Sequence, residues 1–149
     1  MSAVIRVATE QDLADLVALC AEHAHHERGD YDAHGKIAAL RHAMYGPSPR
    51  VSAWVAELAA VVVGYATAAA EFSTWDAREY LHLDCLFVRA DLRGHGVGAA
   101  LLSAVREHAR RAGHTRLEWQ TPAWNVDASR FYRRAGAIGA GKERFRLDL

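Results

Sequence analysis

The fold of this chain is decided by a short glycine-rich stretch, Arg93-Gly94-His95-Gly96-Val97-Gly98. An apolar run, Leu81 to Val88, precedes this stretch, and an apolar-periodic segment, Gly98 to Ala112, follows it. The stretch is therefore predicted to be a turn between a strand and a helix, where bare backbone N–H groups meet the positive end of a helix dipole. Because glycines let an anion approach those amides, the turn predicts a phosphate-bearing ligand.

Two other phosphate-binding motifs fit this stretch less well. It lacks the Gly-Lys-Ser/Thr ending of a P-loop. Gly94, Gly96 and Ala99 satisfy a loose dinucleotide pattern, and Glu118 lies at a suitable distance downstream. In a dinucleotide fold, however, the turn opens directly at the end of its strand, whereas here Arg89 to Arg93 intervene. The sequence therefore favours a different phosphate ligand.

Three motifs resemble the GNAT superfamily of acyl-CoA-dependent N-acyltransferases. The spacing Arg93-x-x-Gly96-x-Gly98 resembles the pyrophosphate-binding motif of that superfamily. Residues 125–136, Asn-Val-Asp-Ala-Ser-Arg-Phe-Tyr-Arg-Arg-Ala-Gly, are similar to its second block, and Leu83-Asp84-Cys85-Leu86-Phe87-Val88 is similar to its central strand. The order of elements matches from Val51 onwards. The resemblance implies an enzyme that uses acetyl-CoA as its co-substrate.

Hydrophobic periodicity predicts the remaining elements. Strands are expected at Val4–Val7, Val51–Glu57, Val61–Ala69, Tyr80–Val88, Arg116–Thr121 and Lys142–Leu149, the last of which closes the sheet. Helices are expected after the Thr9 cap, at Asp32–Tyr45, at Gly98–Ala112 and at Asp127–Arg134. This pattern predicts a single α/β domain of α+β type over residues 1–149. Its mixed, largely antiparallel central sheet is flanked by helices, as the GNAT resemblance also implies.

Two residues are the predicted catalytic groups. An alkylamine with a pKa of about 10 is protonated at neutral pH, so an acyltransferase must take a proton from it and give one to the departing thiolate. In the resembled family, the Tyr of the Phe-Tyr pair points at the thioester sulfur, which makes Tyr132 the expected acid. The alternative is that Tyr132 is an amphipathic core residue with its hydroxyl paired. Asp84 is the expected base.

Strand alternation predicts two opposite faces around Asp84: His82, Asp84 and Leu86 on one side, and Leu83, Cys85 and Phe87 on the other. A carboxylate in so apolar a strand needs a partner or a task, and the alternative to a base is a salt bridge or a loop hydrogen bond. Residues 75–88 look most like the diamine (spermidine/spermine) acetyltransferase branch, which carries Glu at this position. Because Asp84 is one methylene shorter, it is expected to act through ordered water, with His82 as the second candidate.

The resemblance implies that all three motifs bind acetyl-CoA. The expected contacts are Leu86, Phe87 and Val88 on the strand, Arg93, Gly94, His95, Gly96, Val97, Gly98 and Ala99 in the turn, and Asn125, Ser129 and Tyr132 beyond it. Backbone groups of Leu86 and Val88 are expected to pair with the pantetheine amides, as an added strand would. Asn125 is alternatively a turn residue before a helix. Ser129 is one position from Ala128, where the diamine branch has its Ser.

The acceptor end is less defined. Acidic residues that would suit a polycation are Glu22, Glu27, Asp30, Asp32, Glu71, Asp76 and Glu79, although such charge runs are usually solvated faces. Trp75 is expected to pack against substrate methylene groups or else to be a core or interface residue. No metal site is expected, because the histidine spacing matches no zinc pattern.

Composition narrows the class of protein. A formal net charge of +0 at pH 7 gives no reason to expect a nucleic-acid partner, and no apolar run approaches membrane length. Cys20 and Cys85 are expected to be reduced thiols of a cytoplasmic protein, and a homodimer is an expected assembly. Cys85 is not predicted to be a nucleophile, because it is expected to point away from Asp84.

The predicted function is direct transfer of an acetyl group to a primary amine of a small molecule, either a polyamine or diamine or a lysine-like compound. Three other acceptors are left open, namely an amino acid, an aminoglycoside-like antibiotic and a protein N-terminus. A non-catalytic acyl-CoA sensor is the alternative from another class of protein. The presence of both Tyr132 and Asp84 favours the enzyme over the sensor.

Overall fold

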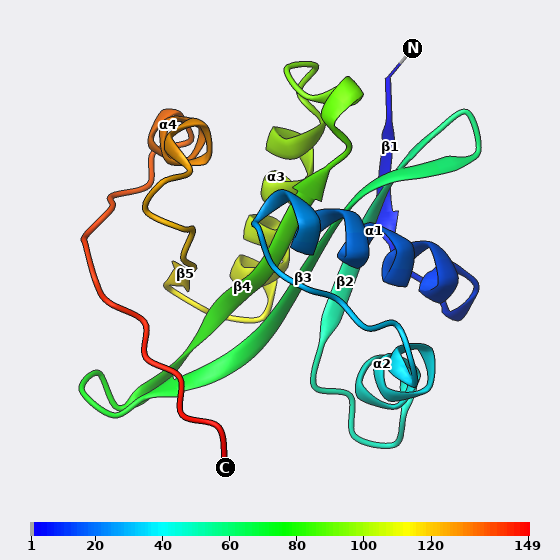
Figure 1. Cartoon of the computed structure of the whole chain (residues 1–149). Coiled ribbons are helices and arrows are strands. Elements are labelled where there is room, and N and C mark those ends of the chain that lie inside the picture. The colour runs from blue at the N-terminus through cyan, green and yellow to red at the C-terminus, as the bar shows by residue number, and fades with distance from the viewer. Residues whose placement is uncertain (1) are drawn as a thin grey trace. The chain divides into compact units, whose positions relative to one another are not determined.

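The computed structural model describes residues 2–149 and is drawn in Figure 1. By their internal contacts, the residues divide into two compact units, Met1–Trp119 and Gln120–Leu149. The first unit holds the whole sheet and three of the helices. The second unit holds one helix and an extended C-terminal segment.

The sheet has five strands: β1 (Val4–Val7), β2 (Ser52–Leu58), β3 (Val61–Ser73), β4 (Arg78–Val88) and β5 (Leu117–Glu118). The strands lie in the order of the chain. Neighbouring strands are antiparallel except for β4 and β5, which are parallel. The predicted mixed, largely antiparallel sheet is therefore confirmed.

Helices cover both faces of the sheet in the first unit (Figure 1). One face carries α1 (Leu13–His26) and α2 (Lys36–Tyr45), and the other carries α3 (Val97–Arg111). Two 3-10 turns, η1 (Glu10–Asp12) and η2 (Ala90–Leu92), lead into α1 and α3. The core under α1 and α2 includes Leu13, Leu16, Leu19, Met44, Val55, Tyr65 and Phe87. Burial of these side chains fixes the α1 and α2 layer on the sheet.

The start of α1 forms as its sequence predicts. The backbone N–H of Thr9 donates to Asp12 Oδ2 at 2.7 Å, and the Thr9 hydroxyl lies 3.3 Å from the same oxygen. Arg6 on β1 donates to both carboxylate oxygens of Asp12, at 2.7 and 2.9 Å. This arrangement satisfies donors that a helix start leaves without intrahelical partners.

Three sequence-based boundaries are wrong. The helix expected at Asp32–Tyr45 begins at Lys36, because Gly35 takes a left-handed conformation (φ 72°) that no helix continues through. The strand expected at Arg116–Thr121 has two residues only. Residues 142–149 form no strand. An alternating segment becomes a strand only where a neighbouring edge supplies hydrogen bonds, and the sheet of the structure ends at β5.

A β-bulge in β4 changes which side chains share a face. Thr67 of β3 pairs with Cys85 while the next residue, Ala68, pairs with Leu83, so Asp84 is left without a partner on β3. An extra residue resets the alternation of a strand. Asp84 and Cys85 therefore lie together on the α1 side, and Leu86 lies on the α3 side. The predicted separation of Asp84 from Cys85, and its grouping with Leu86, are wrong for this reason.

Candidate active site

The C-terminal half of β4 has an open edge. Strand β5 pairs with β4 only at Leu81 and His82, so beyond His82 this edge has no strand partner within residues 2–119. The N–H of Arg89 donates to the Val63 carbonyl at 3.0 Å, which turns the backbone groups of Arg89 towards β3. By antiparallel alternation, the backbone groups of Leu86 and Val88 face the open edge. An extended ligand with amide groups can pair there as a strand would.

The glycine turn follows directly from this edge. Gly94 (φ 78°) and Gly96 (φ 82°) both take left-handed conformations, and Gly96 is the N-cap of α3. No side chain caps α3, and its first turn holds no acidic residue. A Cβ placed on either glycine would meet no described atom within 4 Å, so the space above the amides is open. These features fit a bound pyrophosphate group.

Arg93 fastens the turn to the end of β4. Its Nε donates to the Val88 carbonyl at 2.9 Å, and its guanidinium lies 5.3 Å from the centre of the Phe87 ring. The neighbouring His95 is exposed. The structure thus brings together the predicted cofactor residues from Leu86 to Ala99 along one continuous stretch of the first unit. The Nε–H group of Arg93 therefore bonds to the protein backbone and holds the turn in place.

Asp84 is exposed at the bulge and has a thiol as its neighbour. The Cys85 thiol donates to Asp84 Oδ2 at 3.7 Å. Burial, followed by the charge of Asp84, raises the pKa of Cys85 to about 12. A thiol that stays protonated at neutral pH is a poor nucleophile. Cys85 was expected to point away from Asp84, but its side chain lies beside that carboxylate. The raised pKa of the thiol, and not its direction, is the argument against a nucleophilic role.

A hydrogen-bonded chain on the same face was not predicted from the sequence. The Tyr65 hydroxyl lies 2.8 Å from Nδ1 of His23, and Nε2 of His23 lies 2.5 Å from Glu27 Oε2. Burial raises the pKa of Tyr65, so the hydroxyl keeps its proton and can donate to His23. Phe87 stacks on the His23 ring at 5.1 Å. The only sequence signal was the helical spacing of His23 and Glu27.

Thr67 contributes a buried polar group next to Cys85. Its side chain is buried, at 7% exposure, and within residues 2–149 its hydroxyl meets no partner at full hydrogen-bond geometry but interacts with the Cys85 thiol. Thr67 is paired with Cys85 across the two strands and therefore shares its face. The Thr67 hydroxyl therefore belongs to the polar cluster that Cys85 and Asp84 form on this face of the sheet.

The second unit carries the remaining predicted residues. Asn125 caps α4 (Val126–Arg134), because its Oδ1 accepts from the N–H of Ala128 at 3.2 Å. The alternative interpretation was that Asn125 is a turn residue before a helix, and the hydrogen bond that its Oδ1 accepts is explained by that role. Tyr132 lies on α4 with its ring 5.2 Å from that of Phe131. The cofactor and catalytic roles of Asn125, Ser129 and Tyr132 stay predictions.

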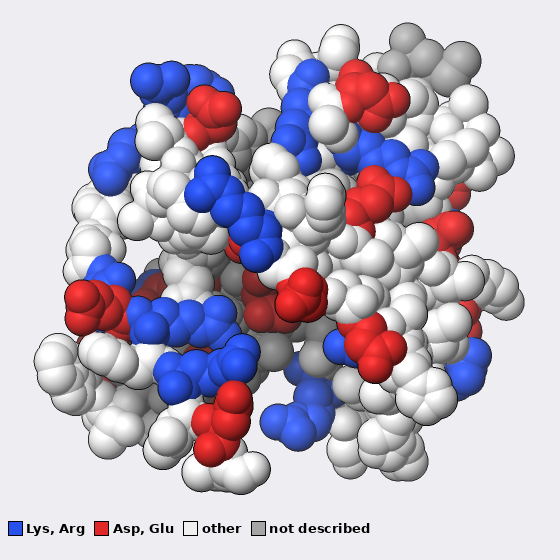
Figure 2. Space-filling model, in the orientation of Figure 1, with Lys and Arg blue, Asp and Glu red and all other residues white. Residues whose placement is uncertain are grey.

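Trp75 and the acidic residues are placed less favourably for binding a polycation. Trp75 is 99% exposed in the β3–β4 turn. At about 3.3 Å per strand residue, the part of β4 from Arg78 to Asp84 places that turn about 20 Å from Asp84. Glu22 is paired with Arg89 at 3.1 Å. Figure 2 shows acidic and basic side chains interspersed on the pictured face.

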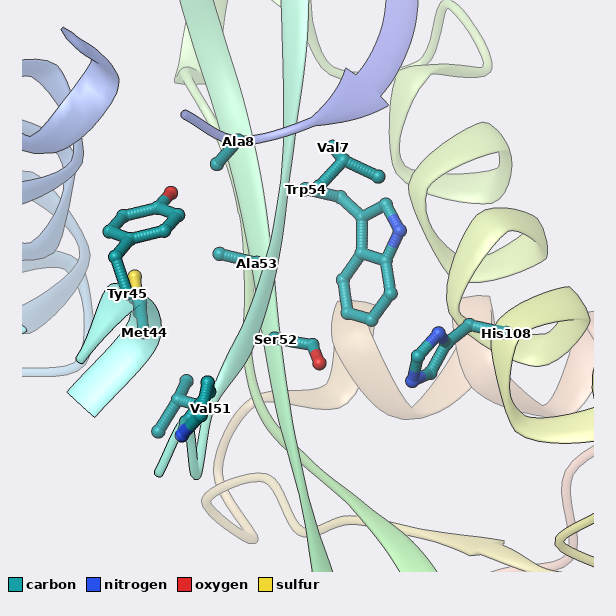
Figure 3. Close-up of a pocket in the computed structure, with 10 residues that line it drawn as sticks. Val7, Ala8, Met44, Tyr45, Val51, Ser52, Ala53, Trp54 and His108 are labelled. Atoms are coloured by element: carbon teal, nitrogen blue, oxygen red, sulfur yellow. The ribbon is translucent and has the colours of Figure 1, made fainter. Parts of the chain in front are cut away.

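Other features lie apart from β4 and its open edge. A pocket of about 240 Å³ lies beside the end of β1 and is lined by Trp54 and His108 among others (Figure 3). The centres of these two rings are 5.1 Å apart. No residue of the predicted site lines the pocket. Within residues 2–149, no group of three or more His, Cys, Asp or Glu side chains could hold a metal ion. The same residues contain no helix long and apolar enough to cross a membrane.

A mixed sheet whose fourth strand loses its neighbour beside a glycine turn fits the acyl-CoA-dependent acyltransferases that the sequence motifs resemble. The chain matches the Acetyltransferase (GNAT) family over residues 7–137 and belongs to that family. Members of the family use acetyl-CoA as their co-substrate. The predicted family and enzymatic class are confirmed.

Relatives and solved structures agree with this assignment. The chain is 30% identical to a thialysine N-epsilon-acetyltransferase from Bos taurus, over 90% of this chain and 83% of that protein. It is 34% identical to an L-ornithine N5-acetyltransferase from Arabidopsis thaliana, over 52% of this chain and 34% of that protein. An integron cassette protein from the mobile metagenome of Cole Harbour Salt Marsh has the same fold. Its TM-score is 0.81 at 26% identity, covering 97% of this chain and 90% of that one. Because the named relatives are enzymes, the non-catalytic sensor is not supported.

Proposed function

We propose that this enzyme acetylates the terminal amine of a small α-amino acid of the lysine or ornithine type. The observation that carries the proposal is Asp84, an exposed carboxylate at a bulge directly before the open edge of β4. The similarity to thialysine and ornithine acetyltransferases supports this acceptor class. Two of the acidic residues expected to attract a polyamine are already paired with arginines, Glu22 with Arg89 and Asp76 with Arg116. That pairing favours an amino acid over a polyamine.

Asp84 is proposed to take the proton that the acceptor amine must lose. The thioester of acetyl-CoA supplies an activated acetyl group when it is bound. A carboxylate within hydrogen-bond reach of the ammonium, directly or through one water, provides general-base catalysis. Asp84 is exposed, so water can reach it. The protonated Cys85 thiol beside it does not compete as an acyl acceptor, which supports direct transfer.

Backbone groups are proposed to hold the rest of the co-substrate. Leu86 and Val88 would bind the amides of the pantetheine arm at the open edge of β4. The amides after Gly96 would bind the pyrophosphate at the positive end of α3. Tyr132 on α4 is proposed to protonate the departing thiolate, as the resemblance to the family implies. A localisation in the cytoplasm and a homodimeric assembly remain proposals of the same kind.

Turnover of acetyl-CoA over an acceptor panel tests the proposed function. The panel contains thialysine, lysine, ornithine, spermidine, putrescine, an aminoglycoside and a peptide with a free N-terminus. We expect the highest kcat/KM for an amino acid with a terminal amine. A preference for the peptide or the aminoglycoside would discard the acceptor class while leaving acetyl transfer intact.

The Tyr132→Phe variant tests the acid on the best acceptor of that panel. Loss of one hydroxyl is expected to lower kcat by ~10²-fold, within the usual range for a general acid. Acetyl-CoA affinity, measured by calorimetry, should stay the same because the ring is retained. Near-normal turnover would leave Tyr132 with a packing role.

A further inference from the structure

We infer that His23 is a positioning residue for acetyl-CoA, because its ring supports Phe87, and Phe87 in turn contacts Arg93 of the glycine turn. The inference rests on the proposed placement of the co-substrate along β4 and the glycine turn. It does not depend on which amine is the acceptor. His23 belongs to the hydrogen-bonded chain that the proposed mechanism leaves unused.

The last turns of α1 contact the end of β4 directly. Figure 1 shows α1 crossing the sheet, and its C-terminal half reaches the strand end that leads into the glycine turn. Glu22 pairs with Arg89, one residue beyond β4, at 3.1 Å. The ring centres of His23 and His26 lie 5.1 and 6.2 Å from that of Phe87. This end of α1 therefore packs against the strand that carries the proposed pantetheine contacts.

The imidazole of His23 is fixed at both of its nitrogen atoms. The Tyr65 hydroxyl, which keeps its proton, donates to Nδ1 at 2.8 Å, so a neutral His23 carries its own proton on Nε2. That nitrogen donates to Glu27 Oε2 at 2.5 Å, one helical turn further along α1. A ring held at two points in a satisfied polar network has little freedom to turn. It therefore offers Phe87 a fixed surface.

Phe87 transmits this support to the glycine turn. Its ring plane lies within 20° of that of His23, and the guanidinium of Arg93 lies 5.3 Å from its centre. Arg93 Nε also donates to the Val88 carbonyl at 2.9 Å, which fixes the place where the chain leaves β4. Arg93 directly precedes Gly94. The position of the Phe87 ring thus bears on the turn that is proposed to bind the pyrophosphate.

The ring and the nitrogen atoms of His23 have separable effects. The nitrogen atoms contribute to stability, because the Tyr65 hydroxyl is buried and bonds to one of them. The flat ring is the part that supports Phe87. Leucine and phenylalanine both remove the nitrogen atoms, but only phenylalanine keeps a flat ring. A purely structural role predicts that the two variants behave alike towards acetyl-CoA.

Calorimetry with acetyl-CoA on the full chain tests the inference. His23→Leu should raise the Kd for acetyl-CoA by roughly 5- to 30-fold, the range in which packed side chains couple to a site, and His23→Phe by less than about threefold. In steady-state kinetics, the same increase should appear in the KM for acetyl-CoA. The kcat at saturating substrates should change little, since His23 is not proposed to contact a reacting group. The melting temperatures of the two variants should fall by similar amounts.

His108→Leu is the matched control, because it removes an imidazole that lies 5.1 Å from the Trp54 ring on the α3 side of the sheet. It should leave the Kd for acetyl-CoA unchanged. Equal affinities of His23→Leu and His23→Phe, whether parental or reduced, would overturn the inference. If circular dichroism shows that His23→Leu does not fold, Tyr65→Phe replaces it. Tyr65→Phe removes one hydrogen bond from the His23 ring and should weaken acetyl-CoA binding by a smaller factor, so a parental Kd in this variant would also overturn the inference.

Gly96→Val separates the inference from the placement on which it rests. A branched side chain at this left-handed glycine should abolish acetyl-CoA binding, because it obstructs the amides at the start of α3. If Gly96→Val binds acetyl-CoA like the parent, the proposed placement fails together with the inference. If Gly96→Val loses binding while the two His23 variants behave alike, only the positioning role of His23 is overturned.

Discussion

The start of α1 and the bulge of β4 each hold a carboxylate, and the two are treated very differently. Asp12 is 5% exposed and accepts hydrogen bonds from Arg6 on both oxygens and from the Thr9 N–H. Asp84 is exposed and has only the weak thiol contact from Cys85 as a hydrogen bond within residues 2–149. Both residues adjoin the layer formed by α1 and α2, yet only the carboxylate oxygens of Asp12 are fully used in hydrogen bonds that hold the fold.

This difference separates a structural carboxylate from the carboxylate proposed to be the base. A buried carboxylate costs free energy unless its oxygens are bonded, and Arg6 and Thr9 meet that requirement at Asp12. Hydrogen bonds from Arg6 and from the Thr9 backbone, with a smaller contribution from the charge of Arg6, hold the pKa of Asp12 below its ordinary value, which makes Asp12 a poor proton acceptor. Asp84 keeps its oxygens available beside the open edge of β4. Three of the predictions that follow test this contrast, and a fourth concerns Thr67.

Asp84→Asn is expected to have the largest effect. The amide keeps the shape of the side chain but cannot take a proton, so kcat should fall by ~10²- to 10⁴-fold, the usual range for a general base. The melting temperature should hardly change. In the parent enzyme kcat should rise with pH and level off, and this rise should flatten in the variant. Steady-state kinetics from pH 6 to 10 measure both effects.

Asp84→Glu is the matched control, because it retains the carboxylate. Its kcat should be higher than that of the Asn variant. Its kcat should also exceed that of the parent if the longer side chain reaches the ammonium without a bridging water. An Asn variant whose pH profile is unaltered would remove Asp84 as the base, and His82 would be the next residue to change.

Asp12→Asn should have the opposite effect to Asp84→Asn, with lower stability and unchanged turnover. It leaves the Arg6 guanidinium without its main counter-charge, so the free energy of unfolding should fall by about 1–3 kcal/mol. Turnover per folded molecule should stay at the parental value. Urea titration and active-site-normalised kinetics measure the two quantities. A loss of turnover without a loss of stability would mean that Asp12 also serves the reaction.

The stability contributed by Asp12 should depend on pH in the acidic range. Because the folded pKa lies below the ordinary value of 3.8, folding favours the ionised form. The stabilising contribution is present above the unfolded pKa and is lost as the pH falls through the folded pKa. The difference in unfolding free energy between the parent and Asp12→Asn should therefore shrink on acidification from pH 5. A constant difference over that range would contradict the assignment.

Thr67→Val should have the smallest effect on stability. Among the described residues the hydroxyl meets no partner at full hydrogen-bond geometry and interacts only weakly with the Cys85 thiol, and valine has nearly the same shape. Removal of an unsatisfied buried hydroxyl should leave the free energy of unfolding unchanged or raise it by up to about 1 kcal/mol. A loss larger than 1 kcal/mol, measured by urea titration, would show that the hydroxyl already has a stabilising partner.

Much of the first unit could be predicted from local patterns. The helix start at Thr9 and Asp12, the β2–β3 hairpin and the glycine turn at Gly96 all depend on neighbours in the chain. Two features of the structure depart from the usual local patterns. The β2–β3 turn is made by Ala59 and Ala60 at positive φ (49° and 63°), where glycine or asparagine is the usual choice. Residues 142–149 alternate like a strand but find no edge in the sheet of the structure.

The sequence by itself determined the family, the glycine turn and the candidate acid and base, because each rests on residues a few positions apart. Tertiary structure alone decided that Asp84 lies beside Cys85, that Tyr65 bonds to His23 and that Lys36 lies over Tyr31. The first depends on the register of β3 against β4, and the second on how α1 packs over β3. Strand register and packing are set by the whole core, so a period-two pattern cannot reveal a residue that the partner strand skips.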